Sequence, residues 1–376
     1  MQKVISIVLN NFKNDSRVLK ECVSLKKAGY YIDVIALHDD GIMEKEQVAG
    51  INIHRVKLKS RSWSKKKFVQ ILKYFEFGYI VLKRFMDTNI IHCNDLNPLP
   101  IACIMRWLSR GRIKIVYDAH EFETERVGLN NPLIKLMMSL LERYLIKKVQ
   151  AVITVSDGIA EQYKLRYKIQ KPYVIMNCPY KQEVEKKDIF RKTFNISENQ
   201  RIFLYQGGLC EGRGLELLIE AFKNYPRNDT VLVFLGYGPL EKFIKETADD
   251  CKNIYFHNAV PPNELLNYTT AADIGICYIS NTCLSYYYCL PNKFFEYCMA
   301  GLPILANNLP EIKNIVQKYK CGEIIEREDV LSINETIDRI MDKDLGYYSE
   351  NAYKVSKEYL WEIEEKKLID IFCKLI

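Results

Sequence analysis

No apolar run in the 376-residue sequence reaches 18 residues, and no two of its twelve cysteines lie close enough for a CxxC motif. We therefore expect no membrane-spanning helix, no zinc site and no disulfide framework, and we expect reduced thiols in a cytoplasmic protein. The opening "MQKVISIVLNN" has no small-residue cleavage site and is interpreted as a buried strand. A full GxGxxG fingerprint is also missing, so a nicotinamide dehydrogenase is the least favoured enzyme class.

Charge is unevenly distributed along the chain. Residues 1–180 contain 30 Lys or Arg and 17 Asp or Glu, whereas residues 181–376 contain 24 and 30. A basic half joined to an acidic half predicts that one half faces an anionic partner. The acidic second half, and the lack of any nucleic-acid-binding signature, argue against nucleic acid.

The densest basic segment is Lys57–Met86, with nine basic residues, one acidic residue and seven aromatic residues. This pattern is typical of a basic amphipathic helix that lies on an anionic membrane surface. The alternative is an ordinary helix packed on a sheet, with its lysines in solvent.

Short apolar runs alternate with helical patterns through both halves, which predicts an α/β fold. We expect two tandem Rossmann-like domains, each a doubly wound parallel sheet, facing across a cleft. The expected bounds are 1–178 for the first domain, 179–199 for a linker, 200–348 for the second domain and 349–376 for a final helix that crosses back. The expected strands are Val4–Leu9, Ile32–Leu37, Ile90–Cys93, Lys114–Tyr117, Ala151–Val155, Tyr173–Met176, Ile202–Gln206, Val231–Leu235, Ile254–His257, Ile274–Tyr278 and Ile304–Ala306.

The segment "PNKFFEYCMAGLP" predicts a short helix with Asn292 as N-cap and Gly301 as its stop. The backbone N–H groups of Lys293 and Phe294 would then be free to bind an anion, to which the Lys293 ammonium is also attracted. Glu296 follows one turn later. A phosphate beside a carboxylate indicates a ligand with phosphates and hydroxyls, such as a nucleotide. The alternative is a capped surface helix with a solvated glutamate.

Two glycine-containing turns follow strands of the second half. "YQGGLCEGRG" places Gly207 and Gly208 at a strand end and Arg213 just before a helix, so that backbone N–H groups and a guanidinium can grip phosphate oxygens. "LGYGPL" contains Gly236 and Gly238, which match only the start of a dinucleotide fingerprint. A plain structural turn is the alternative for both segments.

Polar side chains also follow the expected strands of the first half, at the edge where ligands of such sheets bind. His120 is one of five histidines in the chain. Arg17 lies in the first turn of a helix, against the helix dipole, so a bound anion would help to explain it. Capping of that helix by Asp15 is the structural alternative. The candidates in this half are Asp15, Arg17, Asn94, Asp95, Asp118, His120 and Glu121.

The ordered segments "NDSRVLKE", "HCNDLNPLP", "YDAHE", "VITVSDGI", "IMNCP", "YQGGLCEGRG", "FLGYGPL" and "NKFFEYCMAGLPILA" resemble the retaining nucleotide-sugar glycosyltransferases of family 4, which have the GT-B fold. The resemblance implies that the first domain binds an acceptor through Asp15, Arg17, Asn94, Asp95 and His120. It implies that Glu296 binds ribose, that Arg213 binds diphosphate and that these two act with His120 in catalysis. The implied donor site comprises Gly207, Gly208, Arg213, Gly236, Gly238, Tyr288, Leu290, Asn292, Lys293, Phe294 and Glu296.

Two positions depart from the family pattern. Gly208 stands where the family usually has arginine, and Tyr288 where it has a second glutamate. Backbone amides and tyrosines would then hold the sugar. The resemblance implies retention of configuration. We expect a UDP-sugar as donor, and the basic first half suits a saccharide or lipid-diphosphate-linked acceptor. Arg213 and the helix N–H groups can stabilise the leaving diphosphate, so we expect neither cofactor nor metal; the Asp342-Lys343-Asp344 triplet follows a helical pattern and is discounted as a metal site. Two alternatives stay open: a nucleotide-sugar epimerase of the same architecture, and a non-catalytic subunit that binds nucleotide sugar or membrane.

Overall fold

The computed structural model describes residues 1–13, 15–64, 66–129 and 131–376, and the chain forms two compact units. Unit 1 comprises Met1–Ile175 and Glu365–Ile376, and unit 2 comprises Met176–Glu364. Each unit is a sheet covered by helices, so the predicted pair of α/β domains is confirmed. Within the described parts of the chain, no helix is both long enough and apolar enough to cross a bilayer.

The sheet of unit 1 has the strand order β3-β4-β2-β1-β5-β6-β7-β8. Every neighbouring pair is parallel except β3 and β4, which form an antiparallel edge. The order reverses between β1 and β5, and ligands of such sheets bind beyond the carboxyl ends of the strands at this point. The strands are β1 Lys3–Ile7, β2 Tyr31–Leu37, β3 Lys45–Val48, β4 Ile51–Val56, β5 Ile90–Asn94, β6 Lys114–Ala119, β7 Ala151–Thr154 and β8 Tyr173–Val174.

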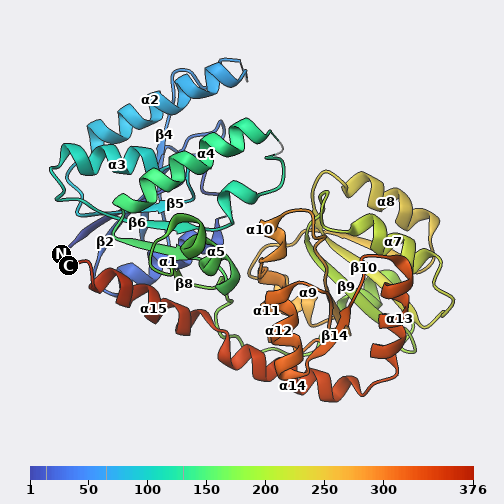
Figure 1. Ribbon diagram of the computed structural model, residues 1–376. Coiled ribbons are helices and arrows are strands. Elements are labelled where there is room, and N and C mark those ends of the chain that lie inside the picture. Colours follow the sequence, from blue (N-terminus) through green and yellow to red (C-terminus); the bar gives the residue numbers. More distant parts are fainter. Residues whose placement is uncertain (14, 65, 130) are drawn as a thin grey trace. The chain divides into compact units, whose positions relative to one another are not determined.

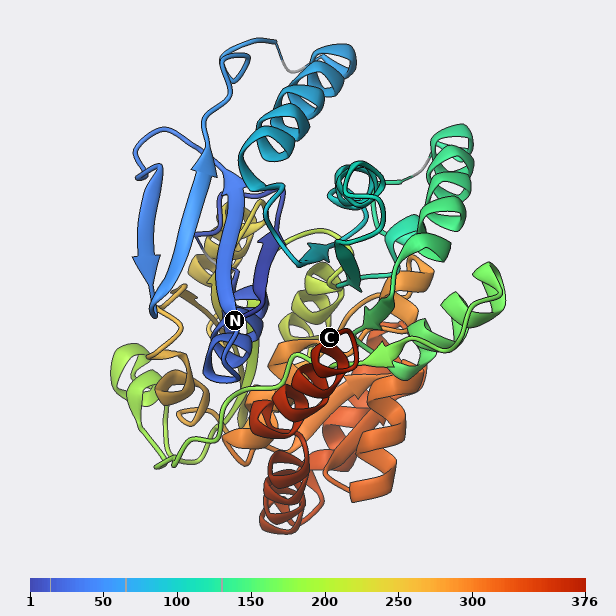
Figure 2. The same ribbon diagram turned by 90° about the vertical axis from the view of Figure 1, so that its left-hand side faces the viewer.

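Helices cover the sheet of unit 1, and α3 contacts both α2 and α4. Figure 1 shows these elements, and Figure 2 shows α3 end-on between α2 and α4. The helices are α1 Ser16–Lys27, α2 Lys67–Phe85, α3 Leu99–Leu108, α4 Pro132–Leu145 and α5 Asp157–Tyr167, with short 3-10 turns η1 Glu123–Glu125 and η2 Ile146–Lys148.

The sheet of unit 2 is entirely parallel, in the order β11-β10-β9-β12-β13-β14. Successive residues of β9 enter two different apolar clusters, because alternate side chains of a strand point to opposite faces. The order reverses between β9 and β12, and the Gly207-Gly208 turn lies at the end of β9. The strands are β9 Arg201–Gly208, β10 Thr230–Tyr237, β11 Ile254–Asn258, β12 Ile274–Cys277, β13 Ile304–Asn307 and β14 Gly322–Ile325.

Ten helices are described that lie wholly or partly in unit 2. They are α6 Ile189–Phe194, α7 Leu215–Lys223, α8 Glu241–Asp250, α9 Leu265–Thr269, α10 Leu284–Tyr287, α11 Asn292–Met299, α12 Pro310–Tyr319, α13 Val330–Met341, α14 Leu345–Glu358 and α15 Trp361–Cys373.

The structure differs from the expected elements in three respects. The segment 179–199 contains helix α6, whose Phe190 is fully buried in the core of unit 2. The expected single final helix is two helices, because Tyr359 leaves helical geometry with φ −113° and ψ 78°. The last of them passes from unit 2 into unit 1, where Phe372 packs edge-on against Tyr30 and His92. Strands β3, β4 and β14 were not predicted.

Candidate functional site

Close packing of backbone fixes the glycine turns beyond β9 and β10. A Cβ atom on Gly236 would come within 1.9 Å of the Gly207 carbonyl oxygen, and one on Gly238 within 2.3 Å of the Leu209 carbonyl oxygen. Gly207 also has a φ of 122°, which side-chain-bearing residues rarely adopt. These contacts give Gly236 and Gly238 a structural role, and their predicted donor contacts remain predictions.

Lys293 is a buried lysine whose amino group has no hydrogen-bond acceptor among the described residues. Its side chain is almost fully buried, and Nζ has no hydrogen-bond partner among the described residues. Nζ lies 3.5 Å from the centroid of the Tyr205 ring, which is a cation–π contact. Burial lowers the pKa of Lys293 to about 7. A buried ammonium of this kind is stabilised by an anion that enters the site.

Arg213 lies near Lys293, and its positive charge helps to lower the lysine pKa. The guanidinium carbon lies 4.7 Å from the centroid of the Tyr286 ring. No carboxylate in the described parts of the chain forms an ion pair with Arg213. Two neighbouring basic side chains thus lie against aromatic rings and form no ion pair with a carboxylate among the described residues, which leaves them available to a diphosphate.

Glu296 is held by a chain of hydrogen bonds that begins on the neighbouring strand. The Nε2 group of Gln206 donates to Glu296 Oε2 at 2.6 Å, and the hydroxyl of Thr269 lies 2.8 Å from Gln206 Oε1. The backbone N–H of Gln206 in turn donates to the Tyr297 hydroxyl at 2.9 Å. Because Gln206 immediately precedes Gly207, this chain fixes the carboxylate beside the glycine turn, where it can accept hydrogen bonds from a diol.

The start of α11 differs from the expectation. Pro291 is the N-cap, and Asn292 is the first helical residue, with no side-chain cap. The Phe294 N–H is not free, because it donates to the Pro291 carbonyl at 3.0 Å. Gly301 follows the end of the helix, as predicted, and its φ is 68°.

Two further predicted donor residues precede α11. Tyr288 is the C-cap of α10, and its ring packs edge-on against Tyr287 with centroids 4.8 Å apart. Leu290 is buried in an apolar cluster of unit 2. Their predicted contacts with the donor remain predictions.

In unit 1, Arg17 is paired within the chain. Its Nη2 donates to both oxygens of Asp118 at 3.0 Å, Nη1 donates to the Ile175 carbonyl at 2.8 Å, and Nε lies 3.0 Å from Glu21. All three charged side chains are buried. Burial raises the pKa of Asp118, but Arg17 and His120 outweigh it and hold that pKa well below its usual range. Burial and Asp118 raise the pKa of Glu21 well above its usual range. Arg17 thus needs no bound anion to explain it.

His120 lies between two carboxylates. Its Nε2 is 3.5 Å from Asp118 Oδ2, its Nδ1 is 3.8 Å from Asp95 Oδ1, and its backbone N–H donates to that oxygen at 3.2 Å. Burial lowers the pKa of His120, but Asp95 and Asp118 outweigh it and raise it to about 10. The imidazole is therefore a cation at neutral pH and a donor of hydrogen bonds.

The other acceptor candidates have local structural roles as well. Asp15 caps α1 by accepting from the Val18 N–H at 3.3 Å. Asn94 is buried, and its Nδ2 donates to the Ser6 hydroxyl at 2.8 Å. Asp95 has a φ of 68°, and its carboxylate accepts a hydrogen bond from the His120 N–H directly after β6. The predicted residues after β1, β5 and β6 are thus brought together, because these strands are neighbours.

Glu21, Asp118 and His120 have potential metal-ligand atoms within 4.8 Å of one another. The Arg17 guanidinium contacts both carboxylates and holds the place of a cation. His120, with its raised pKa, has no free lone pair at neutral pH. This group of side chains therefore does not suit a metal ion. In the discounted triplet, Asp344 caps α14 by accepting from the Gly346 N–H.

Several supporting residues were not predicted. Gln206, Thr269 and Tyr205 look like ordinary strand and helix residues in the sequence, and Glu21 looks like a surface charge of an amphipathic helix. No local pattern distinguishes Thr269, Tyr205 and Glu21 from ordinary strand and helix residues. Only Gln206, directly before a glycine pair at a strand end, carried a usable signal.

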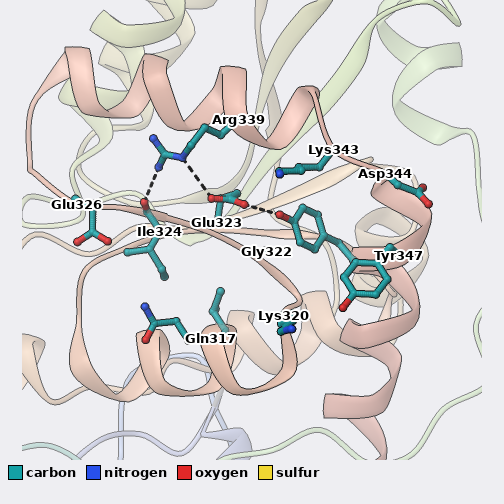
Figure 3. A pocket seen from close by; sticks show the side chains of 12 residues that line it. Gln317, Lys320, Gly322, Glu323, Ile324, Glu326, Arg339, Lys343, Asp344 and Tyr347 are labelled. Atoms are coloured by element: carbon teal, nitrogen blue, oxygen red, sulfur yellow. Dashed lines mark hydrogen bonds and ion pairs between the residues drawn. The ribbon is translucent and has the colours of Figure 1, made fainter.

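A hollow of about 1000 Å³ lies elsewhere in unit 2, beside the edge strand β14. Figure 3 shows Arg339 across it, donating to the Ile324 carbonyl at 3.0 Å and paired with Glu323, which also accepts from Tyr348. These charges are paired with one another, and none of the predicted site residues lines the hollow.

Comparisons with known proteins match two family models to this chain, one in each of its two units. Residues 17–178 match the model "Glycosyltransferase Family 4", and residues 185–355 match "Glycosyl transferases group 1". An uncharacterized glycosyltransferase of Methanocaldococcus jannaschii is 23% identical over 93% of this chain and 90% of its own length. Chitobiosyldiphosphodolichol beta-mannosyltransferase of Debaryomyces hansenii is 21% identical over 89% and 78%.

The fold is also found among solved structures. The Anabaena protein HepE in complex with UDP-glucose superposes with a TM-score of 0.76, at 12% identity, over 100% of both chains. The two family models together span nearly the whole chain, and the predicted resemblance is confirmed. The chain belongs to the glycosyltransferases of family 4, and its two α/β units are domains of the GT-B fold.

Proposed function

We propose that this glycosyltransferase moves a hexosyl or N-acetylhexosaminyl group from a nucleoside-diphosphate sugar, with UDP as the favoured nucleotide, and retains the anomeric configuration. The observation that carries the proposal is the pair Lys293 and Arg213, two neighbouring basic side chains that form no ion pair with a carboxylate among the described residues. The UDP-glucose bound to HepE supports the choice of donor, since that protein has the same fold.

In the proposed reaction, Lys293 and Arg213 bind the diphosphate and stabilise the negative charge that grows on it as the sugar C1–O bond breaks. The acceptor oxygen forms the new bond to C1 on the same face, and its proton passes to an oxygen of the leaving phosphate. Glu296, oriented by Gln206, accepts hydrogen bonds from the ribose hydroxyls. The protonated His120 donates a hydrogen bond to a substrate oxygen. The charge is then stabilised without a metal, and no cofactor takes part.

For the acceptor we propose a saccharide, free or carried on a lipid diphosphate, in the assembly of cell-surface polysaccharide or glycoprotein glycans. The name of the Debaryomyces hansenii relative, with its diphosphodolichol-linked chitobiose, supports this class. The basic composition of residues 1–180 suits an anionic acceptor. We place the protein in the cytoplasm, at the cytoplasmic face of a membrane.

A donor panel tests the proposal. Purified protein is incubated with UDP-, GDP- and ADP-sugars, with and without EDTA, and nucleoside diphosphate release is followed by mass spectrometry. We expect turnover of a UDP-sugar that survives EDTA. Turnover of none would favour the non-catalytic subunit, interconversion of the sugar without release of UDP would favour the epimerase, and loss of activity in EDTA with rescue by manganese would contradict the metal-free mechanism.

A further inference from the structure

Helix α4 turns its apolar stripe away from the core of unit 1. Its inner face instead buries Glu142, whose Oε1 accepts hydrogen bonds from Tyr117 at 2.6 Å and Tyr163 at 2.7 Å and whose Oε2 accepts one from Tyr167 at 2.5 Å. These three bonds fix the rotation of the helix about its axis. The stripe left outside follows the i, i+3, i+4 spacing of a buried helix face, with side chains 43–66% exposed: Leu133, Leu136, Met137, Leu140, Leu141 and Tyr144.

Helix α2 also presents apolar side chains to solvent, although Phe77, Val81 and Phe85 on its inner face are buried in unit 1. Its Lys73 is buried and donates to the Arg61 and Trp63 carbonyls at 3.1 and 2.9 Å, while Glu76 accepts from the Lys59 N–H at 2.6 Å. The helix spans Lys67–Phe85, so it is shorter than the expected basic segment Lys57–Met86. Its solvent-facing side chains are largely aromatic and aliphatic. The outward side chains, 39–69% exposed, are Phe68, Ile71, Leu72, Phe75 and Tyr79.

Helix α3 joins these two faces, because it contacts both α2 and α4 and exposes an apolar patch of its own. Trp107 at its carboxyl end is 76% exposed, and Ile104 and Leu108 are 46% and 51% exposed. We name the exposed apolar side chains of α2, α3 and α4 the three-helix surface. A soluble monomer rarely exposes so many large apolar groups on neighbouring elements, and such a patch marks an interaction site.

The charges on this surface show which partner it fits. Its two acidic side chains, Glu76 and Glu142, are occupied by the hydrogen bonds above. The exposed charged side chains described on α2, α3, α4 and η2 are all basic: Lys83, Arg84, Arg143, Lys147 and Lys148. Aromatic and aliphatic groups edged by cations match the interface of an anionic bilayer, where apolar groups enter the acyl boundary and cations contact phosphates.

We propose that the three-helix surface docks unit 1 on an anionic lipid bilayer, and that the apolar stripe of α4 enters the interface. The proposal moves the predicted membrane contact from the basic segment alone to a surface centred on α3 and α4. It rests on exposure, helix orientation and charge, and it is independent of the donor site. Docking at a bilayer would hold the enzyme where a lipid-linked acceptor lies.

Co-sedimentation with vesicles tests the proposal on the full chain. Vesicles of phosphatidylcholine are compared with vesicles that also contain phosphatidylserine or phosphatidylglycerol. The apolar variant is Leu136→Gln, Met137→Gln and Leu140→Gln; its matched control in unit 2 is Phe243→Gln, Leu331→Gln and Tyr347→Gln, whose residues are 42–70% exposed. The charge variant is Arg143→Glu, Lys147→Glu and Lys148→Glu; its control, with the same change in net charge, is Lys192→Glu, Lys242→Glu and Lys252→Glu.

We expect wild type and both controls to bind anionic vesicles, with an affinity that falls as salt is added. The charge variant should lose roughly a hundredfold or more in partitioning, since each cation near the surface contributes about fivefold. The apolar variant should lose at least about tenfold. Binding of the apolar variant or of the charge variant at the wild-type level, or no binding by wild type, overturns the proposal. A wild-type dimer that the apolar variant converts to a monomer in light scattering assigns the surface to a second copy instead.

Discussion

Replacing Arg213 by alanine should lower the turnover of the nucleotide sugar by about 100- to 1000-fold, the range for loss of one preorganised contact to developing charge. The guanidinium lies over the Tyr286 ring without an acidic partner among the described residues, so its removal breaks no ion pair. The loss should therefore appear in turnover and not in thermal stability. The release of nucleoside diphosphate, measured alongside the melting temperature, checks both parts.

Two further variants sharpen this test. Arg213→Lys keeps the charge but not the forked geometry, so it should recover part of the activity. Arg227→Ala removes an arginine of the same unit that pairs with Asp229 at 2.7 Å, and it should leave turnover unchanged. If Arg213→Ala is as active as wild type, the glycine turn before α7 has only a structural role.

Replacing Asp118 by asparagine should destabilise the protein by about 3–5 kcal/mol, because it leaves the buried Arg17 and the protonated His120 without their shared counter-charge. The pKa of Asp118 is held below its usual value in the folded state, so its contribution is present at neutral pH and is lost on acidification. Urea unfolding at pH 7 and at decreasing pH measures both effects.

Glu142→Gln is the matched control for Asp118. Glu142 is equally buried, but its partners are three tyrosine hydroxyls, and burial raises its pKa. Glutamine keeps an acceptor for those hydroxyls, so the loss should be only about 1–2 kcal/mol. If both variants lose the same stability, the charge of Asp118 does not organise the cluster.

The sequence predicts every strand except β3, β4 and β14, since most of the others are uninterrupted apolar runs bounded by turns. It fails at β3 and β4, where "KEQV" and "INIHRV" alternate polar and apolar residues at a sheet edge and resemble a loop. Helix α6, which contains Phe190, was also missed within the expected linker. One buried aromatic residue among charged residues gives only a weak signal in the sequence.

The predicted site residues meet because strand order brings the ends of β1, β5 and β6 together, and this follows from the general rule for doubly wound sheets. Their partners could not be predicted. Arg17 looks like a cation that awaits an anion until Asp118, far along the chain, is placed beside it. The apolar stripe of α4 likewise looks like a core face until the tyrosines around Glu142 fix its rotation.

The central claim is that Lys293 and Arg213 form the diphosphate site, and the protonation of Lys293 allows a direct measurement. The pKa of Lys293 is lowered to about 7 in the free protein, so above pH 7 the amine is largely neutral. A bound diphosphate favours the ammonium form, and binding must then take up a proton. UDP itself is fully ionised well above its phosphate pKa of about 6.

The measurement is a calorimetric titration with UDP between pH 7.5 and 9, in buffers of different ionisation enthalpy, for wild type, Lys293→Met and the exposed-lysine control Lys242→Met. We predict that wild type and the control take up close to one proton, that Kd rises toward tenfold per pH unit, and that Lys293→Met shows neither effect. Binding of UDP without proton uptake by wild type, or uptake that persists in Lys293→Met, would contradict the assignment of this site.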